Sequence, residues 1–335
     1  MKLPEINGAK FLLIAGVVLI HCNLTEDPDL GGGLPAVAAG VINYLSGWLC
    51  SVCVPLFFLF SGFLFFRPAD RLTPRLYAAK LRSRLHTLLV PYLLWNTIAG
   101  LLFVYKTYFR GYEAFGTIDN PWLLVDGFWS LQSGYPFDFP LWFLRNLIVM
   151  CVLSPFAWLL GRNNYGMAVA VLFFILSSHD LGGGLYFVAG VWLRVHPRVY
   201  AALNRRFCSI AGAVVWAGLG LLFLYCFRSI YEPLYNLLWC VYIGASLCAV
   251  LGGGRLLRGH AEGLAQLTFF IYAWHGLYCS IVRSAMMRFT GIATTGQTLL
   301  AYVLTFAVLI ISSIIVYVVA QRLLPRFTSI LTGGR

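Results

Sequence analysis

The sequence predicts an all-α protein, a polytopic membrane bundle of about ten transmembrane helices with both termini in the cytoplasm. Three observations lead to this prediction: the composition, a series of long apolar segments, and the distribution of basic residues among the loops. Of the 335 residues, 60% are hydrophobic and only 11% are charged. A water-soluble domain carries about 25% charged residues, so the composition excludes an ordinary soluble enzyme.

A helix needs about 20 apolar residues to cross the hydrocarbon core of a bilayer. Ten segments have this character, although the fifth and sixth are short and their boundaries stay open. They cover residues 9–24, 45–66, 85–105, 140–160, 165–178, 184–195, 207–226, 235–251, 264–287 and 296–320. Residues 34–47 are expected to form a separate helix at the interface. The first segment lacks the cleavage pattern of a signal peptide, so we expect it to remain as a span.

The basic residues support this order of spans. With a cytoplasmic N-terminus and alternating spans, 18 of the 24 lysines and arginines fall in cytoplasmic segments and four in outer loops. The acidic residues show the reverse, nine outside and three inside. Positive loops stay in the cytoplasm. This bias accounts for most of the net charge of +12, which therefore needs no nucleic-acid partner.

The soluble segments are short, and the chain shows no internal repeat. The longest outer loop, residues 106–139, is rich in aromatic, glycine and acidic residues. We expect it to form a cap over the bundle rather than a free linker. Residues 1–335 are expected to form a single membrane domain.

Ionisable groups inside spans are costly, so each one is a candidate for function. Lys10 and His21 are eleven positions apart in the first predicted span, a separation of about 16 Å and about three helical turns. The two side chains should therefore lie on one face of the helix. His275 lies inside the ninth span, and both histidines are candidate catalytic residues. The alternative for each is a buried histidine hydrogen-bonded to its surroundings.

Two arginines also lie within spans. Arg145 is a candidate substrate-binding residue because a guanidinium gathers anionic or polar groups, and Lys10 is a second one. The alternative for Arg145 is that it snorkels to the outer interface, and we favour that alternative for Arg283.

The cytoplasmic segment 67–84 holds six basic residues. Such a density favours phosphate binding, either to a soluble cosubstrate or to the anionic headgroups of membrane lipids. The candidate cofactor-binding residues are Arg75, Lys80, Arg82 and Arg84. Topology alone also predicts basic residues here.

Other chemistries find less support. Cys50 and Cys53 have CxxC spacing, but without a second pair or a nearby histidine we expect no metal site. The sequence contains no Walker loop, GxSxG elbow or HExxH motif. The predicted spans carry no Asp or Glu, which weakens the case for an ion-coupled transporter.

Lys10 and His21 give the first predicted span a basic residue, ten positions and then a histidine. Four further stretches follow along the chain, and they are VPLFFLFSGFLFF (54–66), KLRSRLHTLLVPYLLW (80–95), FPLWFLRNLIVMCVLSP (139–155) and FFIYAWHGL (269–277). In this order the stretches together resemble the integral-membrane acyltransferase family three, whose first span carries Arg-x10-His. Lys10 replaces the usual arginine, and Arg82-Ser-Arg84 with Lys80 stands in place of the family's Arg-x-x-Arg.

The resemblance implies an acyltransferase that modifies surface polysaccharides and related acceptors. The expected donor is acyl-CoA, and acetyl-CoA in particular. Its phosphates would bind to the basic cytoplasmic face, and its acyl-pantetheine arm would extend past Lys10 toward His21. A hydroxyl of an extracytoplasmic glycan or lipid-linked glycan would be the acceptor. His21 would act either as general base or as transient acyl carrier. Either role needs the neutral imidazole, which burial in the bundle favours.

The alternative is a carrier or flippase for a polar glycan or lipid-linked sugar, with the same cavity and no chemistry. We expect a bacterial inner membrane as the location. The sequence leaves the oligomeric state open, a homo-oligomer included, and it identifies neither the acceptor nor the acyl group.

Overall fold

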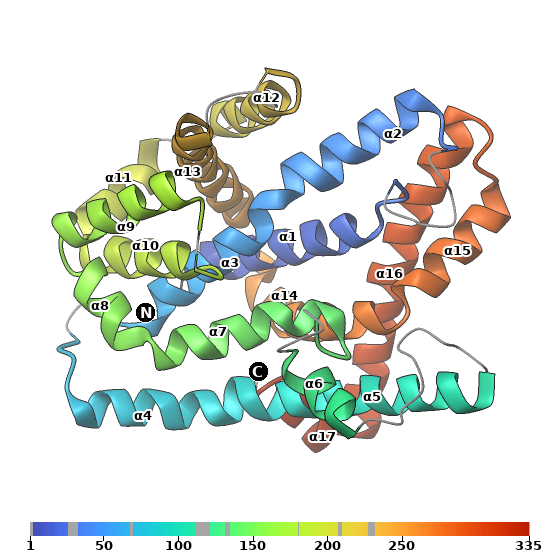
Figure 1. Ribbon diagram of the computed structural model, residues 1–335, viewed down its shortest axis with the longest axis horizontal. Helices are drawn as coiled ribbons and strands as arrows, with labels where there is room; N and C mark the ends of the chain where they lie inside the picture. The colour runs from blue at the N-terminus through green and yellow to red at the C-terminus, as the bar shows by residue number, and fades with distance from the viewer. Residues whose placement is uncertain are drawn as a thin grey trace.

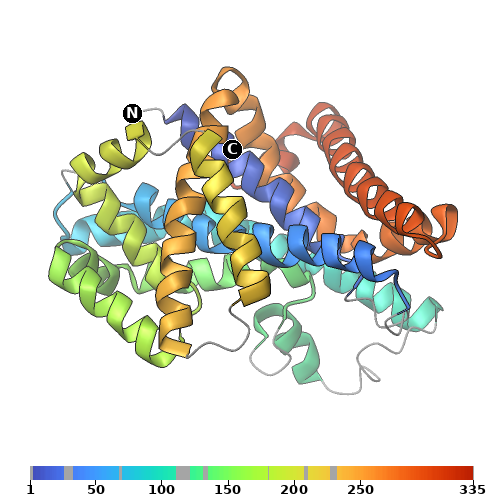
Figure 2. The ribbon, with the colours of Figure 1, turned by 90° about the horizontal axis from the view of Figure 1, so that it is seen from above.

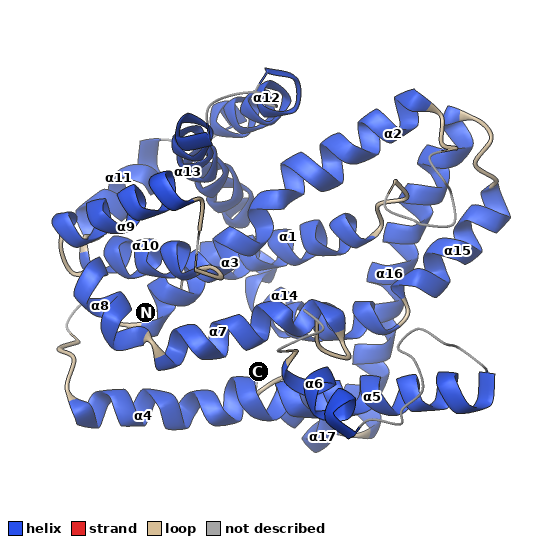
Figure 3. Ribbon diagram, viewed as in Figure 1, coloured by secondary structure: helices blue, strands red, loops and turns tan. Residues whose placement is uncertain are grey.

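The computed structural model describes residues 3–25, 33–67, 70–110, 121–130, 135–179, 181–206, 210–226 and 232–334. Every regular element in these residues is helical, and no strand occurs among them (Figure 3). The predicted all-α fold class is therefore confirmed.

The described helices are labelled in chain order in Figure 1. The α-helices are α1 (Pro4–His21), α2 (Ala36–Ile42), α3 (Cys53–Phe65), α4 (Pro74–Arg84), α5 (Val90–Arg110), α6 (Pro121–Trp129), α7 (Trp142–Val152), α8 (Ser154–Gly161), α9 (Asn164–Ser177), α10 (Gly184–Val195), α11 (Pro197–Arg206), α12 (Ile210–Cys226), α13 (Glu232–Leu256), α14 (Ala261–Trp274), α15 (Cys279–Thr290), α16 (Thr295–Leu323) and α17 (Pro325–Leu331). Short π-helical and 3₁₀ segments connect some of them. The π-helical segments are η2 (Asn43–Leu49) and η4 (Leu85–Leu89), and the 3₁₀ segments are η3 (Cys50–Val52), η5 (Phe139–Leu141), η6 (Arg258–His260) and η7 (His275–Leu277).

Helix α1 lies at the centre of the bundle, where it packs against α3, α13, α14 and α16 (Figures 1 and 2). Glycine allows the close crossing with α13, because a Cβ atom at Gly8 would lie 2.4 Å from the carbonyl oxygen of Gly254. Small residues let membrane helices approach closely in this way. The helix that carries both Lys10 and His21 is therefore held on several sides.

Two of the predicted spans are longer in the structure than expected. Helix α2, the turns η2 and η3, and α3 form one apolar helical segment of 30 residues, Ala36–Phe65. The predicted separate interfacial helix at 34–47 is therefore wrong, because the backbone passes from α2 into a π-helical turn without a break. Helix α4 likewise continues through η4 into α5, and this rod runs along the lower edge of Figure 1.

Two other predicted spans are interrupted. Helices α7 and α8, which correspond to 140–160, meet at an angle of 72°. Pro155 explains the bend, because proline has no backbone N–H to donate to the preceding turn and its ring clashes with the carbonyl group four residues earlier. The segment 264–287 is divided by the 3₁₀ turn η7, so that α14 ends just before His275 and α15 turns to pack against α16.

By length and composition, five helical segments in the described residues can cross a membrane, or six if α7 and α8 count as one bent span. The five are Pro4–His21, Ala36–Phe65, Pro74–Lys106, Glu232–Leu256 and Thr295–Leu323. The shorter helices α9 and α10 are also apolar. A polytopic helical bundle is thus confirmed, whereas the count of ten spans and the cytoplasmic placement of both termini stay predictions.

Candidate active site

The structure brings the two candidate histidines together. His21 is the last residue of α1, and the centroid of its ring lies 5.3 Å from that of His275, with the rings at 29° to each other. The edge of the pair is covered by Phe139, whose ring centroid lies 4.8 Å from that of His21. Two imidazoles from helices far apart in the sequence therefore form one stacked pair.

The break between α14 and α15 sets the position of His275. Its Nδ1 atom lies 2.9 Å from the carbonyl oxygen of Ile271. Since a carbonyl oxygen only accepts, Nδ1 must carry the proton, and in the neutral ring Nε2 is then an acceptor. The His275 side chain is fully buried, and Nε2 has no hydrogen-bond partner among the described residues.

A cavity of about 560 Å³ runs along one face of α1. Asn7 and Lys10 line its end at the start of the helix, and His21 lines the other end. The predicted common face of Lys10 and His21 is confirmed, because both side chains face this one cavity. His275 is not part of its wall, so of the stacked pair only His21 faces this cavity.

Most of the cavity wall is apolar. The apolar and aromatic lining residues are Val17, Ile20, Val54, Phe57, Leu64, Phe65, Leu88, Pro140, Trp142, Phe143, Leu144, Leu147, Phe187, Ala265 and Phe269. Polar groups are few, and they are Ser61, Arg84, Cys151, Gln266, Thr268 and Tyr272, with Asn7, Lys10 and His21 on α1. A cavity with this lining is typical of a site for a mostly apolar ligand that is oriented by a few polar contacts.

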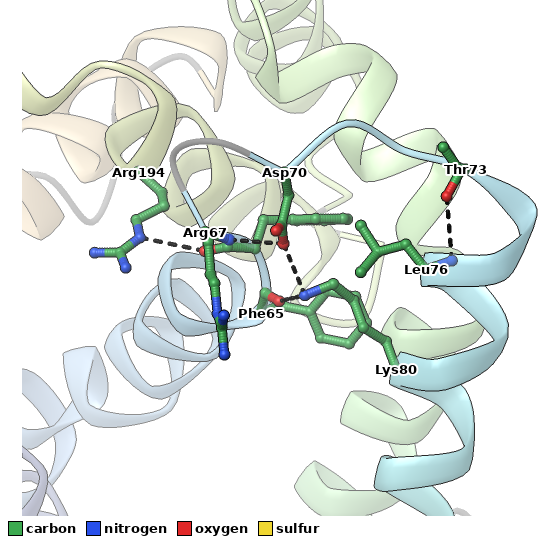
Figure 4. A network of polar contacts seen from close by, with 8 residues as sticks. Phe65, Arg67, Asp70, Thr73, Leu76, Lys80 and Arg194 are labelled. Atoms are coloured by element: carbon green, nitrogen blue, oxygen red, sulfur yellow. Dashed lines mark hydrogen bonds and ion pairs between the residues drawn. The ribbon is translucent and has the colours of Figure 1, made fainter. Parts of the chain in front are cut away.

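The basic cluster on α4 divides into groups with different surroundings. Lys80 Nζ lies 3.0 Å from a carboxylate oxygen of Asp70 and donates to the carbonyl oxygen of Phe65, at the end of α3 (Figure 4). Its ammonium also lies 5.2 Å from the ring centroid of Phe66. Lys80 thus fastens α4 to the end of α3 and is already occupied by partners within the chain.

The carboxylate of Asp70 is the centre of this contact. Its burial disfavours the charge, but hydrogen bonds from the Arg67 backbone N–H, 2.9 Å away, and from Lys80 outweigh that effect. The pKa of Asp70 is therefore lower than that of an unperturbed aspartate. Arg194 joins the same place from α10 by donating to the carbonyl oxygen of Phe66, 3.2 Å away (Figure 4).

The other three basic candidates differ in their access to the cavity. Arg84 lines it and holds its guanidinium carbon 5.5 Å from the ring centroid of Phe65. Arg75 and Arg82 are exposed and do not line it. Of the four predicted phosphate-binding residues, Arg84 is thus the one that lines this cavity, and phosphate binding stays a prediction for all four.

Arg145 lies outside the cavity wall. Its Nη1 atom donates to the carbonyl oxygens of Trp129, 3.0 Å away, and Ser130, 3.1 Å away, and to the hydroxyl of Ser130 at 2.9 Å. Arg145 therefore fastens α7 to the C-terminal end of α6. A role in substrate binding stays a prediction for this residue. Arg283 donates to the carbonyl oxygen of Asn23, two residues beyond His21.

Asp138 is a buried residue that is not among the candidates predicted from the sequence. Only 1% of this residue is exposed, and neither of its carboxylate oxygens has a hydrogen-bond partner among the described residues. A Cβ atom at Gly276, next to His275, would lie 2.6 Å from Asp138 Oδ1. Asp138 is the second-last residue of the predicted outer loop 106–139, and much of that loop lies outside the described residues. The available signal was an aspartate directly before the Phe-Pro that opens an apolar helix.

Groups of side chains that could bind a metal ion were sought in the part of the chain that the structure describes. There, no three His, Cys, Asp or Glu side chains come close enough together to hold an ion. Cys50 and Cys53 are buried, free thiols.

Comparisons with known proteins agree with this arrangement. A family model described as an acyltransferase domain matches residues 3–319. The chain is also similar to the succinoglycan biosynthesis protein ExoH of Rhizobium meliloti, with 26% identity over 210 residues. That match covers 60% of this chain and 54% of the relative, so it spans about half of the relative's length. No solved structure matches the chain.

Proposed function

The chain belongs to this acyltransferase family. We therefore propose that it transfers an acyl group, which we expect to be acetyl, from acyl-CoA to a hydroxyl of an extracytoplasmic glycan. The observation that carries the proposal is the cavity that joins Lys10 and Arg84 at one end to His21 at the other. The polysaccharide acceptor is suggested by the name of the similar succinoglycan biosynthesis protein.

The length of the cavity supports acyl-CoA as the donor. The arm between the pyrophosphate and the thioester sulfur of CoA is about as long as four extended residues, or about 14 Å. Lys10 and His21 are about 16 Å apart along the helix axis. With its phosphates near Lys10 and Arg84, the donor would present its thioester beside His21.

His21 has the position of a general base. In this step its neutral imidazole takes the proton of the acceptor hydroxyl while the oxygen attacks the thioester carbonyl. The carbon–sulfur bond then breaks, and the proton passes from His21 to the departing CoA thiolate. The stacked His275 packs against the ring of His21 and is not part of the cavity wall. A transient acyl-imidazole on His21 would use the same geometry.

Direct transfer tests the proposal. The purified protein in lipid nanodiscs is given acetyl-CoA labelled in the acetyl group and polysaccharide fragments, and the label on the fragments is measured. We expect transfer by the wild type. Uptake of the glycan without any transfer or hydrolysis of acetyl-CoA would instead favour the carrier function.

Matched variants locate the chemistry. His21→Ala should lower transfer by about 10²- to 10⁴-fold, the usual contribution of a positioned general base. His86 is an exposed histidine on η4 outside the cavity wall, so His86→Ala should leave the rate unchanged. Equal rates for the two variants would remove His21 from the reaction.

A further inference from the structure

A second cavity of about 850 Å³ opens beside the Lys10 end of the first. It is built by the start of α1, the turn η6 and the start of α14. Its lining residues are Leu3, Pro4, Ile6, Asn7, Leu64, Arg258, Gly259, His260, Glu262, Gly263 and Leu264. Asn7 and Leu64 line both cavities, so the two spaces adjoin at these residues.

The second cavity adds an arginine and a histidine to the arginine, Arg84, that α4 places on the first cavity. Arg258 and His260 of η6 are exposed, and neither side chain makes a hydrogen bond or ion pair with another described residue. Lys80, in contrast, is held by Asp70 and Phe65. Two arginines that make no ion pair with another described residue therefore line these cavities, Arg258 on η6 and Arg84 on α4.

The two adjoining cavities correspond to the two halves of a CoA molecule, the pantetheine arm and the nucleotide. The mostly apolar cavity along α1 contains Lys10 and His21, which are about 16 Å apart along the helix, and the pantetheine arm is about 14 Å long. The second cavity has a volume of about 850 Å³, within the usual range of about 300–1,000 Å³ for small-ligand sites. Its lining includes Arg258, His260 and the carboxylate of Glu262, which is able to accept a hydrogen bond from a ribose hydroxyl or an adenine amino group.

We propose that this second cavity binds the 3′-phosphorylated adenosine diphosphate half of the acyl-CoA donor, with Arg258 and His260 contacting its phosphates. This inference rests on the proposed function for the identity of the donor. Arginine suits the role because its planar fork matches phosphate oxygens. The hydrogen bonds to phosphate would be charge-assisted, which makes each about twice as strong as a neutral one. Asn7 would lie at the junction between the nucleotide and the arm.

Binding of CoA to the full-length protein in nanodiscs of uncharged lipid tests the inference. The dissociation constant is measured for the wild type, Arg258→Ala, Arg258→Glu and His260→Ala. We expect Arg258→Ala to weaken CoA binding about tenfold, as one charge-assisted hydrogen bond implies, and Arg258→Glu to weaken it further. The KM for acetyl-CoA should rise with them, while kcat at saturating donor stays the same.

Arg162 provides a matched control, because it is an exposed arginine at the end of α8 that lines neither cavity. Arg162→Ala should bind CoA as the wild type does. Wild-type affinity in both Arg258 variants would overturn the inference and leave the proposed function intact. Failure of the wild type itself to bind CoA would instead contradict the proposed function.

An anionic lipid headgroup shares the phosphate chemistry, so a second arm of the experiment distinguishes it. The same measurements are repeated in nanodiscs that contain phosphatidylglycerol. If the cavity binds the nucleotide, Arg258→Ala weakens CoA binding equally in both lipids. An effect of Arg258→Ala that appears only with phosphatidylglycerol would identify the site as one for lipid and overturn the inference.

Discussion

Asp138 is the residue whose surroundings are hardest to reconcile with stability alone. A buried polar group without a partner costs about 1–3 kcal/mol, and more when it is charged. Asp138 has two such oxygens and lies against Gly276, directly after His275. Its backbone N–H donates to Asn96 Oδ1, 3.2 Å away, so the main chain here is held in place. Costly buried groups of this kind concentrate at functional sites.

Replacement of Asp138 should therefore separate stability from activity. We expect Asp138→Asn to leave the melting temperature in detergent close to that of the wild type, because burial favours the neutral carboxyl group and the amide is neutral and of the same size, and to lower acyl transfer at least tenfold. Thermal unfolding and transfer rates on the same preparation provide the two readouts. A lower melting temperature for Asp138→Asn would show that the carboxylate stabilises the resting protein.

At the scale of elements, a few side chains decide how the helices meet. Lys80 fastens α4 to the end of α3, and Arg145 fastens α7 to the end of α6. Both residues had been predicted as ligand-binding groups from their charge. In the structure, Lys80 contacts a carboxylate and a carbonyl oxygen of the chain, and Arg145 contacts two carbonyl oxygens. Sequence spacing does not show such contacts, because they depend on how the helices pack.

The contact between Lys80 and Asp70 should leave a pH signature. The folded-state pKa of Asp70 is lowered, so its stabilising contribution is complete above the unfolded value of about 3.9. That contribution is lost as the pH falls through the lower folded pKa. We expect the difference in melting temperature between the wild type and Asp70→Asn to be constant above about pH 5 and to shrink below about pH 4. A difference that grows on acidification would contradict the contact.

The contact between Arg145 and α6 should be visible in hydrogen exchange. Arg145→Ala is expected to speed exchange in residues 121–130, because three hydrogen bonds to the helix end are lost. Ser130→Ala is the matched control, since it removes only the contact to the hydroxyl, and it should have a smaller effect. An Arg145→Ala variant with unchanged exchange but a higher KM for the acceptor would support substrate binding instead.

At the scale of the whole molecule, the sequence predicts some features well and others poorly. Helical periodicity placed Lys10 and His21 on one face, and the structure confirms it because α1 is unbroken. The proximity of His21 and His275 depends on how α1 and α14 cross, which no local pattern encodes. Pro155 offered a signal for the bend after α7, and Gly276, directly after the C-cap residue His275, offered a signal for the end of α14.

The membrane orientation remains the largest prediction that follows from charge alone. In a cysteine-free background, Ala79→Cys on α4 and Val125→Cys on α6 are both at exposed positions. We expect an impermeant thiol reagent to label Val125→Cys from outside the cell and Ala79→Cys only after the membrane is opened, because of the positive-inside bias. Labelling of both positions from the same side would contradict the predicted topology.

The central claim is that His21 transfers a proton at the end of the α1 cavity, and a comparison of His21→Gln with the wild type tests it most directly. Glutamine retains hydrogen-bonding groups at this position but does not accept a proton near neutral pH. The measurement combines CoA binding with the rate of acetyl transfer in nanodiscs. Our account predicts that His21→Gln binds CoA with an affinity close to that of the wild type while transfer falls by about 10²-fold or more. Near-normal transfer by His21→Gln with intact CoA binding would contradict it.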